Sequence, residues 1–278
     1  MQYYQFVFDN LTNENKEMLI ALLSNVGFEG FEEEDDILKA CTRFDEFDET
    51  EFKNIIDILN IKYSKSIIKE TNWNEKWELG FKPVIVHHPI LHEPFAIIRA
   101  GFHKPVKEIL HELVITPKMS FGTGHHATTY LMIQQMSLLD FNEKGVIDFG
   151  TGTGVLAILA EKMGASEIVA IDHDNWSIDN AQENIEANHC SKIRLLKAET
   201  IGADVDLKAD IILANINLNI IIKNLDALKA ACGTGAAILF SGILKQDEAQ
   251  IVSVLKQNGL VISACFTRDN WLIIVAIR

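Results

Sequence analysis

The chain has few cysteines. Its four cysteines are scattered and show no C-x-x-C spacing: Cys41, Cys190, Cys232 and Cys265. This pattern argues against a disulfide-stapled scaffold and against a zinc ribbon. The adjacent histidine pairs at 87–88 and 125–126 have no acidic or cysteine partner at ligand spacing, and two neighbouring side chains do not easily enter one coordination sphere. We therefore expect no bound metal.

Long apolar runs are also missing. No uninterrupted stretch approaches the ~20 residues that a membrane-spanning helix needs. The first four residues lack the charged and apolar regions of a signal peptide. We therefore expect a cytoplasmic protein without a membrane partner. With 278 residues and 48% hydrophobic content, the chain is long enough for one large core and one small core, which favours two domains.

Basic residues are scarce near the N-terminus. Residues 1–60 contain 15 Asp and Glu against 4 Lys and Arg, and so carry most of the net charge of −14. The acidic clusters at 32–36 and 45–49 would repel a phosphate backbone, so we expect no direct binding to nucleic acid. The clusters would attract a basic partner. A solvated acidic face that only aids solubility fits the charge equally well.

The pattern of the first 70 residues predicts a small α+β domain. Apolar alternation and helical stripes follow the order strand, helix, strand, strand, helix, strand, over 3–8, 14–26, 28–31, 37–42, 48–59 and 61–68. The order βαββαβ is typical of a ferredoxin-like domain, assigned to residues 1–70. Trp73, Trp77 and Phe81 then recur every fourth residue, which predicts a linker helix over 71–82 whose aromatic stripe packs on its own core.

The remainder, 83–278, has the alternation of an open α/β sheet. Three strands, near 84–87, 95–100 and 110–115, precede it. Seven further strands are predicted at 145–149, 167–172, 192–197, 209–214, 236–241, 259–266 and 271–277, with helices between the first six and none between the last two. The fold class is therefore α/β, with a Rossmann-like sheet of seven strands.

A glycine-rich turn opens this sheet. Residues 146–149 form an apolar strand, Gly150, Gly152 and Gly154 follow, and an amphipathic helix runs over 155–163. Asp172 stands at the end of the next predicted strand, where a carboxylate can accept hydrogen bonds from ribose hydroxyls. A lone glycine loop is also compatible with a plain tight turn. Together with Asp172, it indicates a nucleotide-type cofactor site.

The glycine spacing distinguishes between two cofactors. A dinucleotide fingerprint, G-x-G-x-x-G, needs its third glycine where this chain has Val155. Asp148 also places a negative charge near the loop, which does not favour the binding of a negatively charged diphosphate. S-adenosylmethionine has no phosphate and carries a cationic ammonium and sulfonium, which a carboxylate attracts. The pattern resembles the first motif of class I methyltransferases, and a dinucleotide-dependent oxidoreductase remains the alternative.

Two further segments are candidates for the site. Residues 118–129 combine glycines and hydroxyls before a helix that begins at Thr128 or Thr129, and they can wrap the methionine end of the cofactor. A tight turn with a threonine cap is the structural alternative. Asn215 follows the fourth strand of the sheet, at the edge where open α/β sheets bind ligands. It can bind the cofactor carboxylate or an amine, or it can cap the next helix. Residues 198–199 after the third strand are placed near the adenine edge, with a solvated Glu199 as the alternative.

Four motifs together resemble one family over essentially the whole chain. They are Trp73-x-x-x-Trp77-x-x-x-Phe81-x-Pro83, Phe121-Gly122-Thr123-Gly124-x-His126-x-Thr128-Thr129, Asp148-x-Gly150-x-Gly152-x-Gly154 and Ala214-Asn215-Ile216. Their order and spacing are similar to those of the ribosomal protein L11 methyltransferase family. The family usually shows threonine, histidine, proline where this chain has His125, His126 and Ala127, which puts the rigidity of that loop in doubt.

The resemblance implies a function. Members transfer methyl groups from S-adenosylmethionine to lysine ε-amines and the N-terminal α-amine of a large-subunit ribosomal protein. The substrate would be a basic ribosomal protein, docked on the acidic N-terminal domain, and the enzyme a monomer. The alternatives are a class I methyltransferase that acts on another protein, RNA or a small molecule, and a non-catalytic chaperone of ribosomal proteins.

The expected site residues follow from the motifs and the resemblance together. Expected cofactor contacts are Phe121, Thr129, Gly150, Gly152, Asp172 and Asn215. Methyl transfer from a sulfonium is an in-line displacement, so the main task is to hold a neutral amine behind the methyl group. Asn215 is the candidate for orienting this amine. His126 is a second catalytic candidate, although a loop histidine more often has a structural role.

Overall fold

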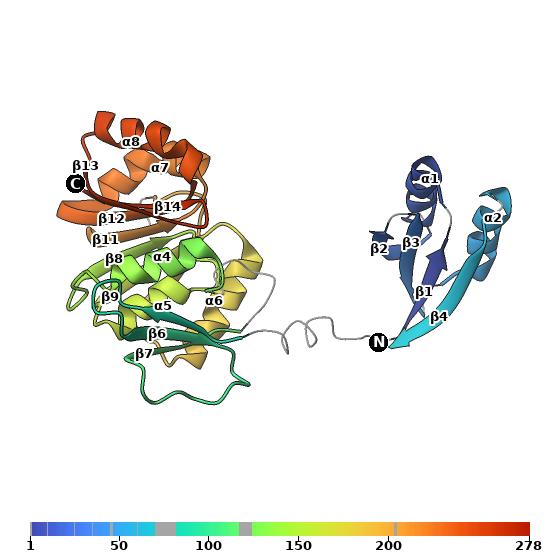
Figure 1. The fold of residues 1–278 in the computed structure, drawn as a ribbon, viewed down its shortest axis with the longest axis horizontal. Coiled ribbons are helices and arrows are strands. Elements are labelled where there is room, and N and C mark those ends of the chain that lie inside the picture. Colours follow the sequence, from blue (N-terminus) through green and yellow to red (C-terminus); the bar gives the residue numbers. More distant parts are fainter. Residues whose placement is uncertain are drawn as a thin grey trace. The chain divides into compact units, whose positions relative to one another are not determined.

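The chain forms two compact units, Met1–Gly80 and Phe81–Arg278 (Figure 1). The computed structural model describes residues 2–9, 11–24, 26–34, 36–44, 47–59, 61–69, 82–116, 124–202 and 205–278. Phe121 and residues 71–81 of the predicted linker helix lie outside these ranges. None of the helices within them combines the length and hydropathy that crossing a bilayer requires.

The first unit is a four-stranded antiparallel sheet with two helices. Its elements are β1 (Gln2–Phe8), α1 (Asn13–Ser24), β2 (Phe28–Glu34), β3 (Ile37–Arg43), α2 (Glu49–Leu59) and β4 (Tyr63–Lys69). This is the βαββαβ order that the sequence predicts, and the strands lie in the order β2-β3-β1-β4. Alternate residues of β1 and β3, such as Phe6, Phe8 and Leu38, are fully buried and build one aromatic-rich core with Phe52. Asp48 accepts the N–H groups of residues 50 and 51 and so starts α2.

A small three-stranded sheet begins the second unit. Strands β5 (Val84–His87), β6 (Pro94–Arg99) and β7 (His111–Val114) lie in the order β5-β6-β7, the first pair antiparallel and the second parallel. Arg99 Nε donates to Glu112 Oε1 at 2.6 Å across the parallel pair. The sequence predicts these strands, but only the structure shows that they form a sheet of their own.

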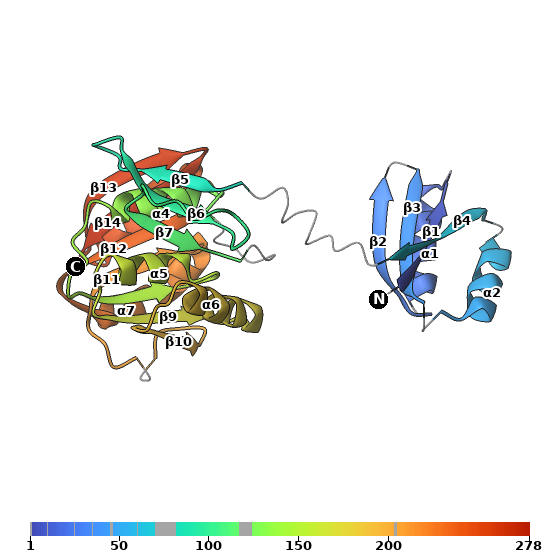
Figure 2. The same cartoon turned by 90° about the horizontal axis from the view of Figure 1, so that it is seen from below.

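The large sheet has seven strands in the order β10-β9-β8-β11-β12-β14-β13, with β14 antiparallel to both neighbours. Its elements are α4 (Ala127–Met136), β8 (Gly145–Phe149), α5 (Val155–Lys162), β9 (Glu167–Asp172), α6 (Asn175–Ala187), β10 (Ile193–Lys197), β11 (Ala209–Asn215), α7 (Leu218–Ala231), β12 (Cys232–Leu244), η1 (Lys245–Asp247), α8 (Glu248–Gln257), β13 (Val261–Arg268) and β14 (Trp271–Ile277). Helices α4, α5 and α6 pack on one face of the sheet, and α7 and α8 pack on the other. Figure 1 and Figure 2 show this unit from two directions. The predicted α/β class and seven-stranded sheet are confirmed.

One predicted helix is wrong. The connection from β10 to β11 contains no helix in its described residues, 198–202 and 205–208. Gly202, a poor helix former, lies within it, and the apolar residues Ile201, Val205 and Leu207 pack against the core from an irregular segment. The connection instead carries Ala198 back to the neighbouring strand, where its N–H donates to the Asp172 carbonyl at 2.9 Å.

The order of the strands determines where a ligand can bind. The chain proceeds outward from β8 through β9 to β10, and then returns to β11 on the other side of β8. Open α/β sheets bind ligands at such a switch point, outside the carboxyl ends of the strands. The ends of β8, β9 and β11 therefore define the candidate site.

Candidate functional site

The glycine loop after β8 has a conformation that other residues rarely adopt. Gly150, Gly152 and Gly154 have φ angles of +80°, +54° and +79°. A Cβ on Gly150 would lie 2.2 Å from Cγ2 of Ile216, so glycine is required there for space as well as for conformation. The Gly150 N–H donates to the Ile171 carbonyl at 2.8 Å, which fixes the loop against the end of β9.

Asp172 links the glycine loop to the second strand. Its side chain is almost fully buried, and Oδ2 accepts the Gly152 N–H at 2.9 Å. Oδ1 accepts the Asp174 N–H at 3.1 Å. The same residue lines a cavity beside the loop, so Asp172 both positions the loop and borders the space where a ribose is expected.

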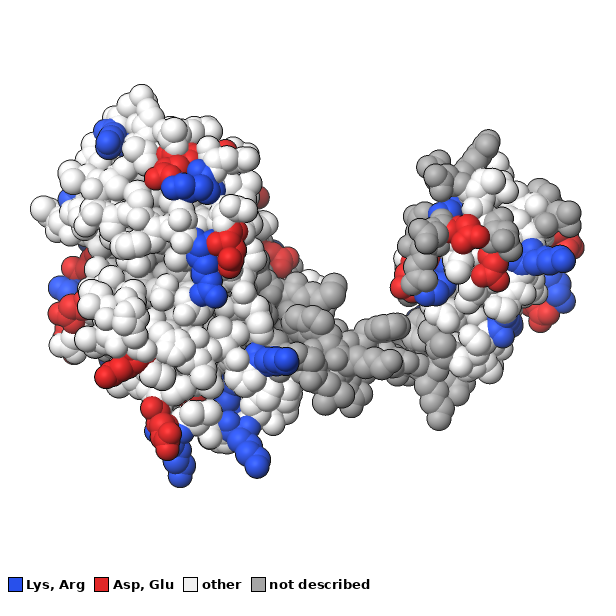
Figure 3. Space-filling view, in the orientation of Figure 1, with Lys and Arg blue, Asp and Glu red and all other residues white. Residues whose placement is uncertain are grey.

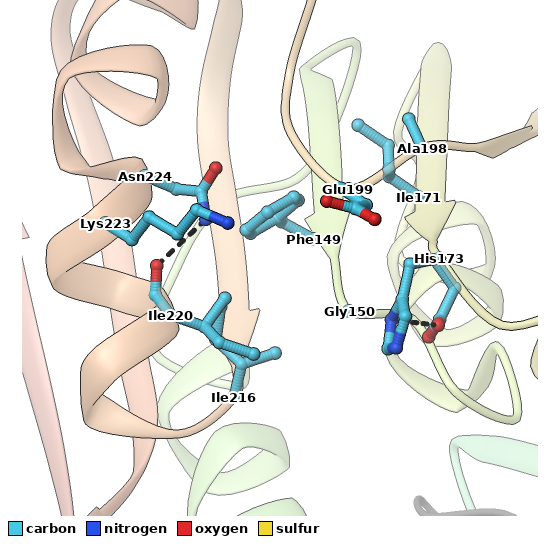
Figure 4. A pocket seen from close by; sticks show the side chains of 11 residues that line it. Phe149, Gly150, Ile171, His173, Ala198, Glu199, Ile216, Ile220, Lys223 and Asn224 are labelled. Atoms are coloured by element: carbon cyan, nitrogen blue, oxygen red, sulfur yellow. Dashed lines mark hydrogen bonds and ion pairs between the residues drawn. The ribbon is translucent and has the colours of Figure 1, made fainter.

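This first cavity, the Asp172 cavity, has apolar walls with polar groups at its edges. Phe149, Ile171, Ile216 and Ile220 supply the walls, and Asp172, His173, Glu199, Lys223 and Asn224 supply the polar groups. Figure 4 shows Lys223 and Asn224 on the α7 side, opposite Glu199 and His173. The predicted segment 198–199 therefore does reach this cavity. Flat apolar walls with a few polar groups suit a heteroaromatic base.

A second cavity, the Asn215 cavity, also borders the glycine loop, at Gly150, Thr151 and Gly152. It shares Gly150, Ile216 and Ile220 with the Asp172 cavity, so the two are contiguous. Its further lining includes Asn215 and Trp271. The residues that line the two cavities include the carboxyl ends of β8, β9 and β11.

Asn215 has an unused hydrogen-bond acceptor in this site. It ends β11 and is 8% exposed. Its Nδ2 lies 3.5 Å from Thr129 Oγ1, whereas its Oδ1 has no hydrogen-bond partner among the described residues. A buried acceptor without a partner costs free energy of folding. The arrangement is therefore suited to a donor group, such as an amine, that the ligand or substrate brings.

Asp148 lies beneath the loop and has no exposed surface. Burial raises its pKa to about 7, although hydrogen bonds from Thr151 and the Ala157 N–H oppose the shift. The Thr151 hydroxyl donates to Oδ2 at 2.6 Å, and Oδ1 has no partner in the described part of the chain. A cation bound nearby would favour the charged carboxylate.

His126 caps the helix that carries Thr129. Its Nδ1 accepts the Thr128 N–H at 3.3 Å and lies 2.8 Å from Thr128 Oγ1, so α4 begins at Ala127, one residue before the predicted start. The His126 ring meets Trp271 edge-on, with centroids 4.7 Å apart, and burial lowers its pKa. His126 thus contacts Trp271, which lines the Asn215 cavity, whereas His126 itself is not among the lining residues.

The structure also contains site features that the sequence analysis missed. Lys223, Asn224 and Trp271 line the cavities but belong to α7 and β14. Buried Asn184 of α6 donates to the Thr153 carbonyl in the glycine loop at 2.8 Å and accepts the Thr116 N–H at 2.8 Å. The sequence signal that could have found Asn184 is a polar residue at a core-facing position of a helix.

Within the described ranges, no three His, Cys, Asp or Glu side chains gather as metal ligands would.

The fold and the contiguous cavities define a class I methyltransferase. The family described as "Ribosomal protein L11 methyltransferase (PrmA)" matches residues 7–278, and the chain belongs to this family. The predicted fold class, enzyme class and family are confirmed, and with them the cofactor, S-adenosylmethionine.

Individual relatives agree with this assignment. A ribosomal protein L11 methyltransferase from Porphyromonas gingivalis is 35% identical over 284 residues, which covers 98% of this chain and 96% of the relative. One from Chlorobaculum tepidum is 37% identical over 266 residues, covering 92% and 90%. The crystal structure of a ribosomal protein L11 methylase from Lactobacillus delbrueckii subsp. bulgaricus has a TM-score of 0.62 and 28% identity, and it covers 70% of this chain and 98% of that one.

Proposed function

We propose that the enzyme methylates amines of ribosomal protein L11, namely lysine ε-amines and the N-terminal α-amine. The observation that carries this proposal is the buried Asn215 Oδ1, which has no partner among the described residues and belongs to a residue that lines the cavity. A substrate amine is a hydrogen-bond donor that this oxygen lacks. The names of the full-length relatives support the choice of protein.

The residues around the cavities fit S-adenosylmethionine. Asp172 would accept the ribose hydroxyls, and the edge around Ala198 and Glu199 would meet the adenine. Gly150 and Gly152 let the backbone approach the ligand, and the methionine end would lie near Thr129 and Asn215, with Phe121 as a further proposed contact. The buried acid Asp148 favours a cationic ligand over a diphosphate. Family membership likewise disagrees with the dinucleotide-dependent alternative.

The chemistry needs orientation more than acid–base catalysis. S-adenosylmethionine, when bound, supplies a methyl group on a cationic sulfur. A lysine has a pKa of ~10.4 in water, and both desolvation and a neighbouring positive charge lower it. The amine can therefore release one proton to water on entry, and Asn215 Oδ1 would hold the neutral amine by accepting one of its two N–H groups. His126 is proposed as a secondary participant that acts by holding Trp271 and the start of α4.

Substrate recognition is assigned to the N-terminal part of the chain. We divide the protein into a ferredoxin-like recognition domain (1–70), a linker helix (71–82) and a catalytic domain (83–278). Side chains of both charge signs appear on the described surface of both units (Figure 3), and the acidic excess of residues 1–60, 15 Asp and Glu against 4 Lys and Arg, comes from the sequence. An acidic recognition surface suits a basic ribosomal protein and repels RNA. A cytoplasmic monomer, without direct nucleic-acid contact, is part of the proposal.

Mass spectrometry tests the proposed function. Purified ribosomal protein L11 is incubated with the enzyme and a labelled methyl donor, and the product is digested to locate the modified amines. We expect label on lysine side chains and on the N-terminal amine. Asn215→Ala should slow transfer by about 10-fold or more, because one buried hydrogen bond to the amine is lost. Absence of label on L11, despite intact cofactor binding, would favour a chaperone or another substrate.

A further inference from the structure

A lysine of the first unit is surrounded by aromatic rings. Lys65 Nζ lies 3.5 Å from the ring centroid of Tyr4, 4.2 Å from that of Phe47 and 5.4 Å from that of Phe6. The rings contact one another as well: Tyr4 and Phe47 are 5.1 Å apart, and Phe6 and Phe47 are 5.3 Å apart. We call Tyr4, Phe6 and Phe47 the aromatic cage.

The sequence builds this cage from adjacent strands and a turn. β1 pairs with β4 so that Phe6 lies opposite Lys65, and directly opposite residues share one face of a sheet. Tyr4 projects to the same face because it is two residues from Phe6. Phe47 comes from the segment before α2. β4 is an edge strand and the Lys65 side chain is exposed, so this side chain can leave the cage without breaking the pairing of the sheet.

An acidic group lies near the cage. The pKa of Glu49, in the first turn of α2, is lowered mainly by a hydrogen bond and ion pair with Lys53, and the charge of Lys65 adds to this effect. Aromatic walls with a nearby carboxylate form a site for a cation of low hydration.

The cage suits a methylated ammonium better than a primary one. A lysine ammonium is strongly hydrated and has three N–H donors, and ring faces replace its water poorly. A quaternary ammonium keeps the charge, has no donor to satisfy and presents methyl groups to the rings. Recognition of methyl-lysine and choline by aromatic cages depends on this difference.

We propose that the aromatic cage binds the methylated amines that the enzyme produces, and that Lys65 occupies it until such a group displaces it. The inference rests on the proposed function for the identity of the ligand. A methylated side chain held on the first unit keeps the substrate on the enzyme while a further amine is modified. Products with several methylated amines are then favoured over singly modified ones.

Binding of choline to the full-length protein tests the cage. Saturation-transfer NMR compares choline with 3,3-dimethyl-1-butanol, its neutral isostere. We expect choline to bind and the isostere not to bind. Lys65→Ala should strengthen choline binding by about two- to fivefold, because the internal competitor is removed. Tyr4→Leu should abolish binding and Tyr4→Phe should retain it, which separates loss of the ring from loss of folding.

A matched control is available on the same strand. Tyr3→Leu changes the neighbouring tyrosine, which alternates to the opposite face of the sheet, and should leave choline binding unchanged. Equal binding of the isostere, or no choline binding to Lys65→Ala, would overturn the proposal and leave Lys65 as a structural cover of the sheet edge. Because this assay needs no methyl transfer, it is independent of the L11 labelling experiment.

Discussion

Asp148 combines complete burial with an ionisable group. Its pKa is raised from 3.8 to about 7 by burial, and the ordinary value applies to the unfolded chain. Between these two values the folded protein keeps a proton that the unfolded chain has released. The contribution of this proton to the free energy of unfolding is fully present below the pKa of Asp148 in the unfolded chain. It is lost as pH rises through about 7, the pKa of Asp148 in the folded protein.

We therefore expect wild type to lose stability relative to Asp148→Asn, which remains neutral, when pH rises from about 5 to about 8. The expected loss in the free energy of unfolding is about 2 kcal/mol. Urea denaturation of both proteins at several pH values measures it, and the difference between the two proteins cancels the titration of other groups. A difference that does not change with pH would show that Asp148 titrates normally.

Asp172 is the proposed ribose-binding residue of the cofactor site. Asp172→Ala removes the proposed ribose acceptor and the hydrogen bond to the Gly152 N–H. We expect the dissociation constant for S-adenosylmethionine to increase about 10-fold or more, as for the loss of a charge-assisted hydrogen bond. Isothermal titration calorimetry measures it. Asp210→Ala is the control, since Asp210 also accepts a glycine N–H, from Gly145 at 2.9 Å, but at the opposite edge of the sheet. Equal effects in both variants would contradict the assignment.

The sequence predicts a site residue when the element that positions this residue is adjacent to it in the sequence. Gly150, Asp172 and Asn215 each follow a recognisable strand, and the ends of parallel strands meet at one edge. Lys223 and Trp271 could not be predicted in the same way. Lys223 lies on the outside of α7, and Trp271 enters the site only because β14 is inserted between β12 and β13.

At the scale of an element, the glycine loop joins β8 to α5 and contacts the segment after β11. Gly150→Ala places a Cβ at φ +80° and 2.2 Å from Ile216 Cγ2. We expect it to lower the free energy of unfolding by more than the roughly 1–2 kcal/mol that a left-handed residue costs, and to weaken cofactor binding. Thermal denaturation and calorimetry measure the two effects.

Gly235→Ala is the matched variant for this loop. Gly235 has φ +74°, and nothing lies within 4 Å of its hypothetical Cβ. The Gly235→Ala variant therefore measures the cost of a left-handed backbone without a steric clash. Its affinity for the cofactor should equal that of wild type. If Gly150→Ala behaves like Gly235→Ala in both measurements, the close approach to Ile216 is unimportant.

Hydrogen bonds between elements are less visible in the sequence than the elements themselves. The strands of the large sheet were predicted to within a few residues because apolar runs and turn residues are local signals. The helix predicted between β10 and β11 rests only on the regular alternation of strands and helices along the chain. Asn184 connects α6, the glycine loop and the segment after β7, and such a contact depends on helices and loops that are distant in sequence.

For the whole molecule, the distribution of charge should separate substrate binding from cofactor binding. Glu32 and Asp36 are exposed and belong to an acidic cluster of the first unit. Neutralising this cluster by Glu32→Gln, Glu33→Gln, Glu34→Gln and Asp36→Asn should slow methylation of L11 at low salt by about 10-fold. Cofactor affinity should not change, because electrostatic steering acts on the encounter of the two proteins.

Initial rates at several salt concentrations measure this effect, and the difference from wild type should decrease as salt screens both proteins. A control with the same loss of charge neutralises exposed acids of the second unit: Glu108, Glu143, Glu167 and Asp226. If the cluster matters only for solubility, both variants will methylate L11 at the same rate and with the same salt dependence. If the acidic surface of the first unit recognises L11, only its neutralisation flattens the salt dependence, since total charge is equal in the two variants.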